Sequence, residues 1–430
     1  MDSHRTPALL VMTSLKMVLR HLRLIEYARE MDVAPVLIFV DGEDTGRLRN
    51  LMNDTGHPLS GLAEIYPIAA CSEDAVLAGV RDLAGRYTIV GVISCGEYFV
   101  EPAAATAHLL GLPGSGRPAA AISRNKFIQR LLLPEYSPRW RVITPRARER
   151  VAAAEYDVGG SLVVKPTTRM SSSGVCELLS PALLADRIAS YPPEETLLVE
   201  ERVAGAEFSV ETLVRDGVPL WSGVTAKETN EGNGAFVETA HTLPAAGLSR
   251  ANAEDLDRAN ADVLRRLEFQ TGVAHAEYRL SSHGVVLMEV AVRIPGGGIS
   301  TLWGLATGRY LEDSIVDLAI GRPTTYPQPV RQARHEFLEH SPGRLVDVTS
   351  PDVDVSWTVR DARWPSLPAA DVGAGVRCRA ALVSKLRGDE LAAFTDGDAR
   401  AVSLIFDGPL GVDLSKEGER VRAGIDIVVA

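Results

Sequence analysis

The chain has 430 residues, and 46% are hydrophobic and 23% charged, which is ordinary for a globular protein of about three domains. Its formal net charge of −11 argues against a broad nucleic-acid-binding surface and leaves anionic ligands to local basic pockets. Lys16, Arg20 and Arg23 interrupt the apolar N-terminus, so a signal peptide is not expected, and no uncharged run is long enough to span a membrane. We therefore expect a cytoplasmic protein with no membrane or nucleic-acid partner. A disulfide framework and a structural zinc site are not expected, since the cysteines are far apart and form no CxxC pair: Cys71, Cys95, Cys176 and Cys378.

Residues 1–122 are expected to form the first domain. Strand-like apolar runs read ALLVM, PVLIFV, AEIYPI and YTIVGVIS, with helical spacing over 15–29 and 74–83. Buried strands that alternate with helices predict a parallel sheet covered on both faces, as in Rossmann-like α/β domains. Ligands of such sheets bind at the carboxyl ends of the strands, so 13–16 and 95–97 are candidate lining, although both also read as plain turns. The chain contains neither GxGxxG nor GxxxxGK[ST], so a dinucleotide fingerprint and a P-loop are not predicted.

A lysine begins the next helical segment. The turn-rich stretch 111–118 leads into a predicted helix over 122–133, with Ser123 or Asn125 as its cap and Lys126 in its first turn. A cation there opposes the helix dipole, so an anionic partner is expected, with a solvent-exposed lysine as the alternative.

A second lysine lies in the apolar strand SLVVKP. Lys165 shares a face with Val163, which is an unfavourable place for a free ammonium group. The loop that follows, over 167–174, is rich in hydroxyl groups and glycine and contains Ser172 and Ser173. A lysine on a strand beside such a loop can hold phosphates without a P-loop. Further along, two strands over 197–212 meet at Gly205.

The stretch 273–298 reads VAHAEYRLSSHGVVLMEVAVRIPGGG, which predicts a hairpin with the loop over 282–284. In this register Glu277 lies opposite Glu289. Two opposed carboxylates repel, so loss of either is expected to stabilise the metal-free protein. They suit a hard cation such as Mg²⁺, which usually shares its ligands with substrate phosphates. The alternative is a hairpin with one solvated, charged face.

Strand alternation adds further polar groups to the carboxylate face of this hairpin. His275 and Arg293 are predicted on that face, with His275 opposite Ala291. A guanidinium fork followed by Gly297 and Gly298, whose backbone N–H groups are free, predicts a site for an anion.

The remaining chain contains helices over 249–271 and 299–320, and then short strand-like runs that predict a small mixed domain over 331–430. The segment HEFLEH resembles a zinc-protease motif, but His335 and His340 are five residues apart and do not share a helix face. We therefore do not predict a metal site there.

Taken together, these pieces resemble the ATP-grasp superfamily, and within it the carboxylate–amine ligases. The matching segments lie in the superfamily's order between residues 88 and 322: the Asn-Lys helix, VVKP, SSSGV, VEERVAGAEFSVE and HAEYRL…MEVAVRIPGG. The resemblance implies an α/β and α+β protein with three parts. These are a Rossmann-like pre-ATP-grasp domain (1–122), an ATP-grasp domain (123–330, with lobes at about 123–200 and 201–330) and a small C-terminal mixed domain (331–430).

The resemblance also implies a nucleotide site. Lys126 and Lys165 would contact the ATP phosphates, with Ser172 and Ser173 in a loop that acts as a lid. Adenine and ribose would be held by Glu200, by the backbone around Glu201 to Val203, and by Glu207.

For the reaction centre, the resemblance implies that Glu277 and Glu289 hold two Mg²⁺ ions, with Mn²⁺ as a substitute. Arg293 would bind the acyl phosphate or the substrate carboxylate. His275 is a candidate for contacting a substrate or taking a proton from the amine, with a structural histidine as the alternative. Glu211 would bind a substrate amine or pair with a neighbouring lysine.

One departure narrows the subgroup. Many members have Asn two residues after the second acidic metal ligand, where this chain has Ala291. In this respect the chain resembles the L-amino acid ligases, which form dipeptides and also tolerate alanine at this position. The expected function is therefore ATP-dependent amide formation between small-molecule substrates, such as amino acids, through an acyl phosphate. A γ-glutamyl ligase, a carboxylase and an inactive ATP-binding module are the alternatives, and the resemblance leaves a homodimer open.

Overall fold

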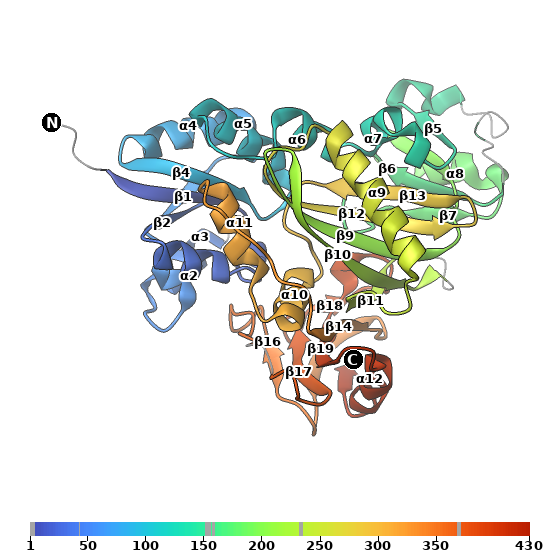
Figure 1. Cartoon of the computed structure of the whole chain (residues 1–430). Helices are drawn as coiled ribbons and strands as arrows, with labels where there is room; N and C mark the ends of the chain where they lie inside the picture. Colours follow the sequence, from blue (N-terminus) through green and yellow to red (C-terminus); the bar gives the residue numbers. More distant parts are fainter. Residues whose placement is uncertain (1–4, 43, 151–155, 157–159, 232–234, 368–370) are drawn as a thin grey trace.

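The computed structural model describes residues 5–42, 44–150, 156, 160–231, 235–367 and 371–430 (Figure 1). Within these ranges the strands form four sheets, one of them parallel throughout and one of nine strands. The predicted α/β and α+β class is confirmed. No helix in the described part of the chain has both the length and the apolar character that crossing a bilayer requires.

The N-terminal sheet is parallel, as predicted, in the order β3-β2-β1-β4. Its strands are β1 (Thr6–Met12), β2 (Ala34–Val40), β3 (Glu64–Ile68) and β4 (Tyr87–Ser94). Alternate residues of β1 enter two different cores, because helices cover both faces. One face packs on α4 (Glu73–Ala84) and α5 (Val100–Leu110), and the other on α2 (Arg23–Glu30) and α11 (Leu311–Ala319).

Three predicted helices are each split in two. The segment over 15–29 is α1 (Leu15–Val18) and α2, because the bonds at Arg20 and His21 tighten to i→i−3 and end the first helix. The segment over 122–133 begins within α6 (Arg117–Ser123) and restarts as α7 (Lys126–Leu132). The segment over 299–320 is α10 (Ile299–Thr307) and α11, separated at the left-handed Gly308.

A four-stranded antiparallel sheet, in the order β5-β8-β6-β7, forms the first half of the central region. It contains β5 (Trp140–Ile143), β6 (Leu162–Pro166), β7 (Cys176–Leu178) and β8 (Leu197–Glu201), with α8 (Leu184–Ala189) packed on it. The chain then passes directly into the largest sheet at Gly205. A Cβ at Gly205 would lie 2.0 Å from the Leu280 carbonyl oxygen, so this crossing requires glycine.

The largest sheet has the order β13-β12-β9-β10-β11-β14-β19-β17-β16. Its first five strands are β9 (Ala206–Arg215), β10 (Val218–Thr229), β11 (Glu238–Leu243), β12 (Gly272–Ser281) and β13 (Gly284–Ala291), and α9 (Arg250–Arg266) packs across them. The sheet continues without interruption into β14 (Arg331–Leu338), β16 (Val355–Trp357), β17 (Arg377–Val383) and β19 (Val402–Pro409). A three-stranded sheet and α12 (Leu414–Ala423) complete the C-terminal segment: β15 (Gly343–Thr349), β18 (Glu390–Leu391) and β20 (Asp426–Val429).

The β12–β13 hairpin contains the predicted residue pairs, but its turn is shorter than predicted and a bulge compensates. Glu277 pairs with Glu289 and His275 with Ala291, as predicted, but the turn has two residues and Ser281 pairs with Gly284. A bulge between Glu277 and Tyr278 restores the register. Because of this bulge Met288 turns into the cleft and Leu287 enters the core, although simple alternation along the strand would place Met288 on the core face.

Candidate active site

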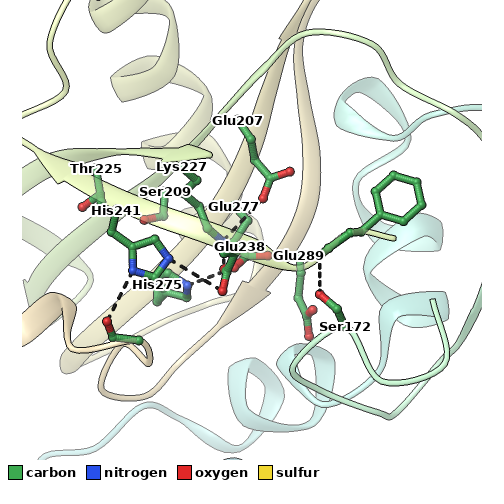
Figure 2. Close-up of polar contacts among 12 residues, drawn as sticks. Ser172, Glu207, Ser209, Thr225, Lys227, Glu238, His241, His275, Glu277 and Glu289 are labelled. Atoms are coloured by element: carbon green, nitrogen blue, oxygen red, sulfur yellow. Dashed lines mark hydrogen bonds and ion pairs between the residues drawn. The ribbon is translucent and has the colours of Figure 1, made fainter. Parts of the chain in front are cut away.

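One cavity of about 830 Å³ lies between the N-terminal sheet, the four-stranded sheet, the nine-stranded sheet and the C-terminal segment. It collects nearly all the residues singled out from the sequence: Lys126, Lys165, Ser172, Ser173, Glu200, Glu201, Val203, Glu207, His275, Glu277, Glu289, Arg293, Gly297 and Gly298. Glu211 does not line the cavity, because it is fully buried behind it. Figure 2 shows how part of this set converges from several strands and from the loop of Ser172.

Lys126 is placed by the start of α7. The Asn125 side chain caps this helix by accepting from the Phe127 amide at 3.0 Å, and Lys126 is the first helical residue. Its ammonium group lies 2.8 Å from Glu289 and donates to the Arg169 carbonyl at 2.7 Å. The predicted anionic partner is therefore a carboxylate of the hairpin, and the lysine is buried rather than exposed.

Lys165 lies in a buried ion-pair group on the four-stranded sheet. Its ammonium group is 2.6 Å from one oxygen of Glu200, and Arg130 is 2.6 Å from the other. Burial would raise the pKa of Glu200, but Arg130 and Lys165 outweigh it and lower that pKa to about 2. Burial, with Arg130 and Lys126 nearby, lowers the pKa of Lys165 to about 8 despite Glu200. Arg130 was not predicted from the sequence, although its position four residues after Lys126 places both on one helix face.

The serine loop reaches across the cavity. Ser172 donates to the Phe236 carbonyl at 2.8 Å (Figure 2), and the Ser171 carbonyl accepts from the Gly397 amide at 3.0 Å. The loop thus contacts the segments that lead into β11 and into β19 of the nine-stranded sheet. Ser172 and Ser173 also line the cavity. This arrangement suits a segment that covers a bound nucleotide.

Each carboxylate of the hairpin has its own cation. Glu277 lies 2.5 Å from Lys227 and 3.2 Å from His275 Nε2, whereas Glu289 pairs with Lys126. Burial opposes the charge on Glu277, but Lys227 and His275 hold its pKa well below the usual range. The predicted repulsion is therefore relieved by the protein itself.

Lys227 was missed in the sequence as a site residue. It lies on β10, opposite Glu207 on one side and His241 on the other, and its ammonium group contacts Glu238 as well as Glu277. Three surrounding carboxylates hold the pKa of Lys227 well above its usual range although burial alone would lower it. The only sequence signal was a lysine among alternating threonines in the run VTAKET.

Glu211 and His275 form a buried pair behind the carboxylates. His275 Nδ1 lies 2.8 Å from Glu211, which also accepts from Ser209 at 2.7 Å, Thr225 at 2.6 Å and the Trp303 indole at 3.1 Å. Burial works against the charge on His275, but Glu211 and Glu277 raise its pKa to about 9. The partner of Glu211 is thus a histidinium and not the lysine considered from the sequence.

Arg293 closes the hairpin side of the cavity against the N-terminal sheet. Its Nε donates to Glu97, its Nη1 donates to the Ile294 carbonyl at 2.9 Å, and Arg124 contacts Glu97 at 2.8 Å. Burial is outweighed by Arg293 and Arg124, so the pKa of Glu97 falls to about 2. Residues 95–97 had been candidate lining, and Gly96 and Glu97 do line the cavity.

The glycine run is held by two buried histidines. A Cβ at Gly297 would lie 2.3 Å from His241, and one at Gly298 would lie 2.9 Å from His335, so both positions exclude side chains. His335 Nδ1 lies 2.8 Å from the Gly297 carbonyl oxygen, and burial lowers the pKa of His335 to about 3. His340 instead contacts the Ala399 carbonyl, so the two histidines of HEFLEH contact different parts of the structure.

The donor set fits a cation that is shared with phosphate. Within the described ranges no group of three or more His, Cys, Asp or Glu side chains could hold a metal by itself. Mg²⁺ typically takes one or two carboxylates and completes its shell with phosphates and water. The opposed pair Glu277 and Glu289 meets that requirement at the edge of the cavity.

Part of the chain matches a known family of domains. Residues 158–301 match the family model of the ATP-grasp domain. The chain is 26% identical over 198 residues to dapdiamide A synthase of Enterobacter agglomerans, a match that spans 44% of this chain and 46% of that protein, less than half of the relative.

The whole fold is similar to solved structures. The L-amino acid ligase from Bacillus licheniformis superposes with a TM-score of 0.77 at 17% identity, over 100% of both chains. The phosphoribosylglycinamide synthetase from Anaerococcus prevotii gives 0.68 at 14% identity, over 99% of this chain and 100% of that one.

Proposed function

We propose that this chain, whose predicted ATP-grasp fold and resemblance to the carboxylate–amine ligases are confirmed, joins a carboxylate to an amine at the expense of ATP. The products are an amide, ADP and phosphate, and amino acids are the substrates. One observation carries the proposal. Two lysines and two opposed carboxylates converge in a single cavity, and Arg293 and the glycine run lie beside them.

The nucleotide lies at the end of the cavity that contains the two lysines. Lys126 and Lys165 contact the phosphates, and the serine loop closes over them. Glu200, Glu201, Val203 and Glu207 line the same end and hold adenine and ribose. When ATP binds, the ammonium group of Lys126 leaves Glu289 and contacts a phosphoryl oxygen. The Glu289 carboxylate can then bind a cation.

Glu277 and Glu289 would hold two Mg²⁺ ions, or Mn²⁺ in their place, and the bound ions would neutralise the charge on the phosphoryl oxygens. Lys227 remains beside Glu277 and keeps that carboxylate ionised. His275, protonated at neutral pH, fixes the orientation of Glu277 from the other side and is itself held by Glu211.

The chemistry proceeds in two displacements. An oxygen of the substrate carboxylate attacks the γ-phosphorus of ATP, the bond to ADP breaks, and an acyl phosphate forms. The amine nitrogen then attacks the acyl carbon, phosphate leaves, and the nitrogen loses a proton. Arg293 and the glycine run hold the carboxylate and then the acyl phosphate, while the closed serine loop excludes water that would hydrolyse it.

The test is a screen of amino-acid pairs for ATP-dependent phosphate release, with mass detection of the products. The expected result is phosphate release that requires both a carboxylate and an amine and yields a peptide or amide. Release driven by bicarbonate would identify a carboxylase, and fragmentation that shows a γ-linkage would identify a γ-glutamyl ligase. ATP binding without any turnover would leave a nucleotide-binding module. Light scattering of the same preparation tests for a homodimer.

A further inference from the structure

One part of the cavity lining, called the far end below, contains cations that the mechanism above does not use. Lys16 and Arg20 come from the segment after β1, and Lys385 and Arg400 come from the C-terminal segment. All four line the same cavity as the hairpin carboxylates. This end is therefore built by two parts of the chain that are about 370 residues apart in sequence but adjacent in space.

Two of these cations form no ion pair with any residue that the structure describes. Within the described part of the chain, the side chains of Arg20 and Lys385 make no ion pair and no hydrogen bond, whereas Lys16 lies 3.1 Å from Asp398 and Arg400 contacts Glu238. Glu238 is shared with Lys227, so four cations face two carboxylates of which one is already engaged. Burial and the nearby Arg400 lower the pKa of Arg20, and the charge of Asp398 only partly offsets them.

Trp364 connects this end to the reaction centre. The Arg20 guanidinium stacks over the Trp364 ring, 5.6 Å from its centroid. The same ring system also approaches the glycine run, since a Cβ at Gly298 would lie 3.6 Å from Trp364 Cζ2. Among the residues that the structure describes, the buried indole N–H of Trp364 has no hydrogen-bond partner. An anion beside Arg20 would thus lie about one ring away from the place where the acyl group is held.

We propose that Arg20 and Lys385 form a binding site for the carboxylate of the incoming amino acid, the substrate whose amine attacks the acyl phosphate. The inference rests on the proposed ligase function and names the acceptor as an amino acid with its carboxylate free. Such an acceptor has a chemical problem that this site solves. Its own carboxylate could reach the γ-phosphate and be activated in place of the intended one. Cations at the far end keep that carboxylate bound and direct the amine toward the acyl carbon.

The test separates activation from acceptor binding by means of hydroxylamine. Hydroxylamine attacks the acyl phosphate and gives a hydroxamate and phosphate, so it reports the first displacement without any amino-acid acceptor. For Arg20→Met we expect unchanged hydroxamate formation and a KM for the amino-acid acceptor raised about tenfold, the scale of one lost charge-assisted contact. With the matching amino-acid amide as acceptor, which has the amine but no carboxylate, wild type and Arg20→Met should have the same KM.

Lys385→Met should repeat this selective loss, and Arg81→Met serves as the matched control. Arg81 is an arginine of α4 with an 84% exposed side chain, paired with its neighbour Asp82. Equal losses with the amino acid and its amide would show that Arg20 only holds Trp364 and would overturn the proposal. A loss of hydroxamate that occurs only with a dicarboxylic donor would also overturn it, because the anion would then belong to the activated acid. If wild type forms no hydroxamate with any carboxylate, the proposed ligase function fails first, and the two failures are thereby distinguished.

Discussion

The two ends of the cavity differ in how completely their positive charges are paired with carboxylates. At the nucleotide end every cation discussed has a carboxylate partner: Lys126 with Glu289, and Lys165 and Arg130 with Glu200. At the far end two cations are paired, Lys16 with Asp398 and Arg400 with Glu238. Arg20 and Lys385 form no ion pair among the described residues, and Arg20 is stacked on an aromatic ring.

This difference indicates two modes of anion binding. A paired lysine must exchange one carboxylate for another anion, so binding there gains specificity at a cost in affinity. An unpaired cation gains a partner outright, so a single carboxylate can bind with few other contacts. The nucleotide end thus suits a large ligand with many charges, and the far end suits a small ligand with one.

The largest effect is expected at the paired end, for Glu277→Gln. The amide keeps the shape of the side chain but removes the charge that holds a cation, and we expect kcat to fall on the order of 10³-fold. Lys227 retains Glu238 and Glu207, so the variant should fold and bind adenosine. Product formation and circular dichroism check this, with the exposed Glu254→Gln as control. Turnover close to wild type would remove the carboxylate pair from the reaction centre.

Removal of the other carboxylate, Glu289, tests whether the pair stabilises or destabilises the metal-free protein. From the sequence, loss of either opposed carboxylate should stabilise the metal-free protein, but the structure reverses that expectation. Glu277 and Glu289 each pair with a buried lysine, and removing one leaves that lysine with less compensation. Thermal unfolding without metal should therefore show a lower Tm for Glu289→Ala than for wild type.

The next effect in size concerns Arg293, between the two ends. Its Nε and Nη1 are used by Glu97 and by the Ile294 carbonyl, so only the rest of the fork can meet a substrate. A lysine cannot hold Glu97 and a substrate oxygen together, and Arg293→Lys should lose about 2–4 kcal/mol of transition-state stabilisation. Amide yield and ATP affinity measured side by side check this. Unchanged yield, or an equal collapse of ATP binding, would remove Arg293 from the acyl site.

A smaller effect follows from the lowered pKa of Lys165, about 8 against the ordinary 10.5. Below about pH 8 the Lys165 ammonium group is charged and can bind phosphate, and this charge is lost as the pH rises through 8. ATP affinity should fall up to about tenfold between pH 7 and pH 9. Lys165→Arg, which keeps its charge, should flatten the profile. Lys165→Ala should lose more affinity for ATP than for adenosine, and equal losses would mean that the residue acts through folding.

The smallest expected effect is the salt dependence of acceptor binding at the far end. Lys16, beside Arg20, is 58% exposed, whereas Lys165 and Glu200 are buried. Exposed charges are screened and buried pairs much less so, and we expect the acceptor KM to rise about threefold between low and high salt. Arg20→Met should reduce that slope. A slope that is the same in both proteins would show that the far end does not attract the acceptor by charge.

The sequence predicted the elements whose pattern is local. The parallel N-terminal sheet and the Glu277–Glu289 pair are as expected, because each depends on alternation within a few residues. The two-residue turn and the compensating bulge could not be predicted, since either change alone would have moved Glu277 out of register and only the folded sheet shows that they cancel.

The site residues that could not be predicted from the sequence were missed for a different reason. Lys227 acquires its role from three carboxylates on other strands, and Arg20 from Trp364, which is 344 residues further along the chain. Neither residue belongs to a motif, so its environment exists only after long-range packing. The predicted roles of individual residues toward ATP, metal and substrate remain predictions.

The unbroken sheet between β11 and β14 has a practical consequence for dissecting the protein. Ala240, His241, Thr242 and Leu243 pair with residues 333–336, which follow the predicted division at residue 330. A chain ended at 330 would leave this edge with unsatisfied amide and carbonyl groups beside buried apolar side chains. Such a fragment should associate edge to edge or precipitate, and co-expression with residues 331–430 should restore its solubility.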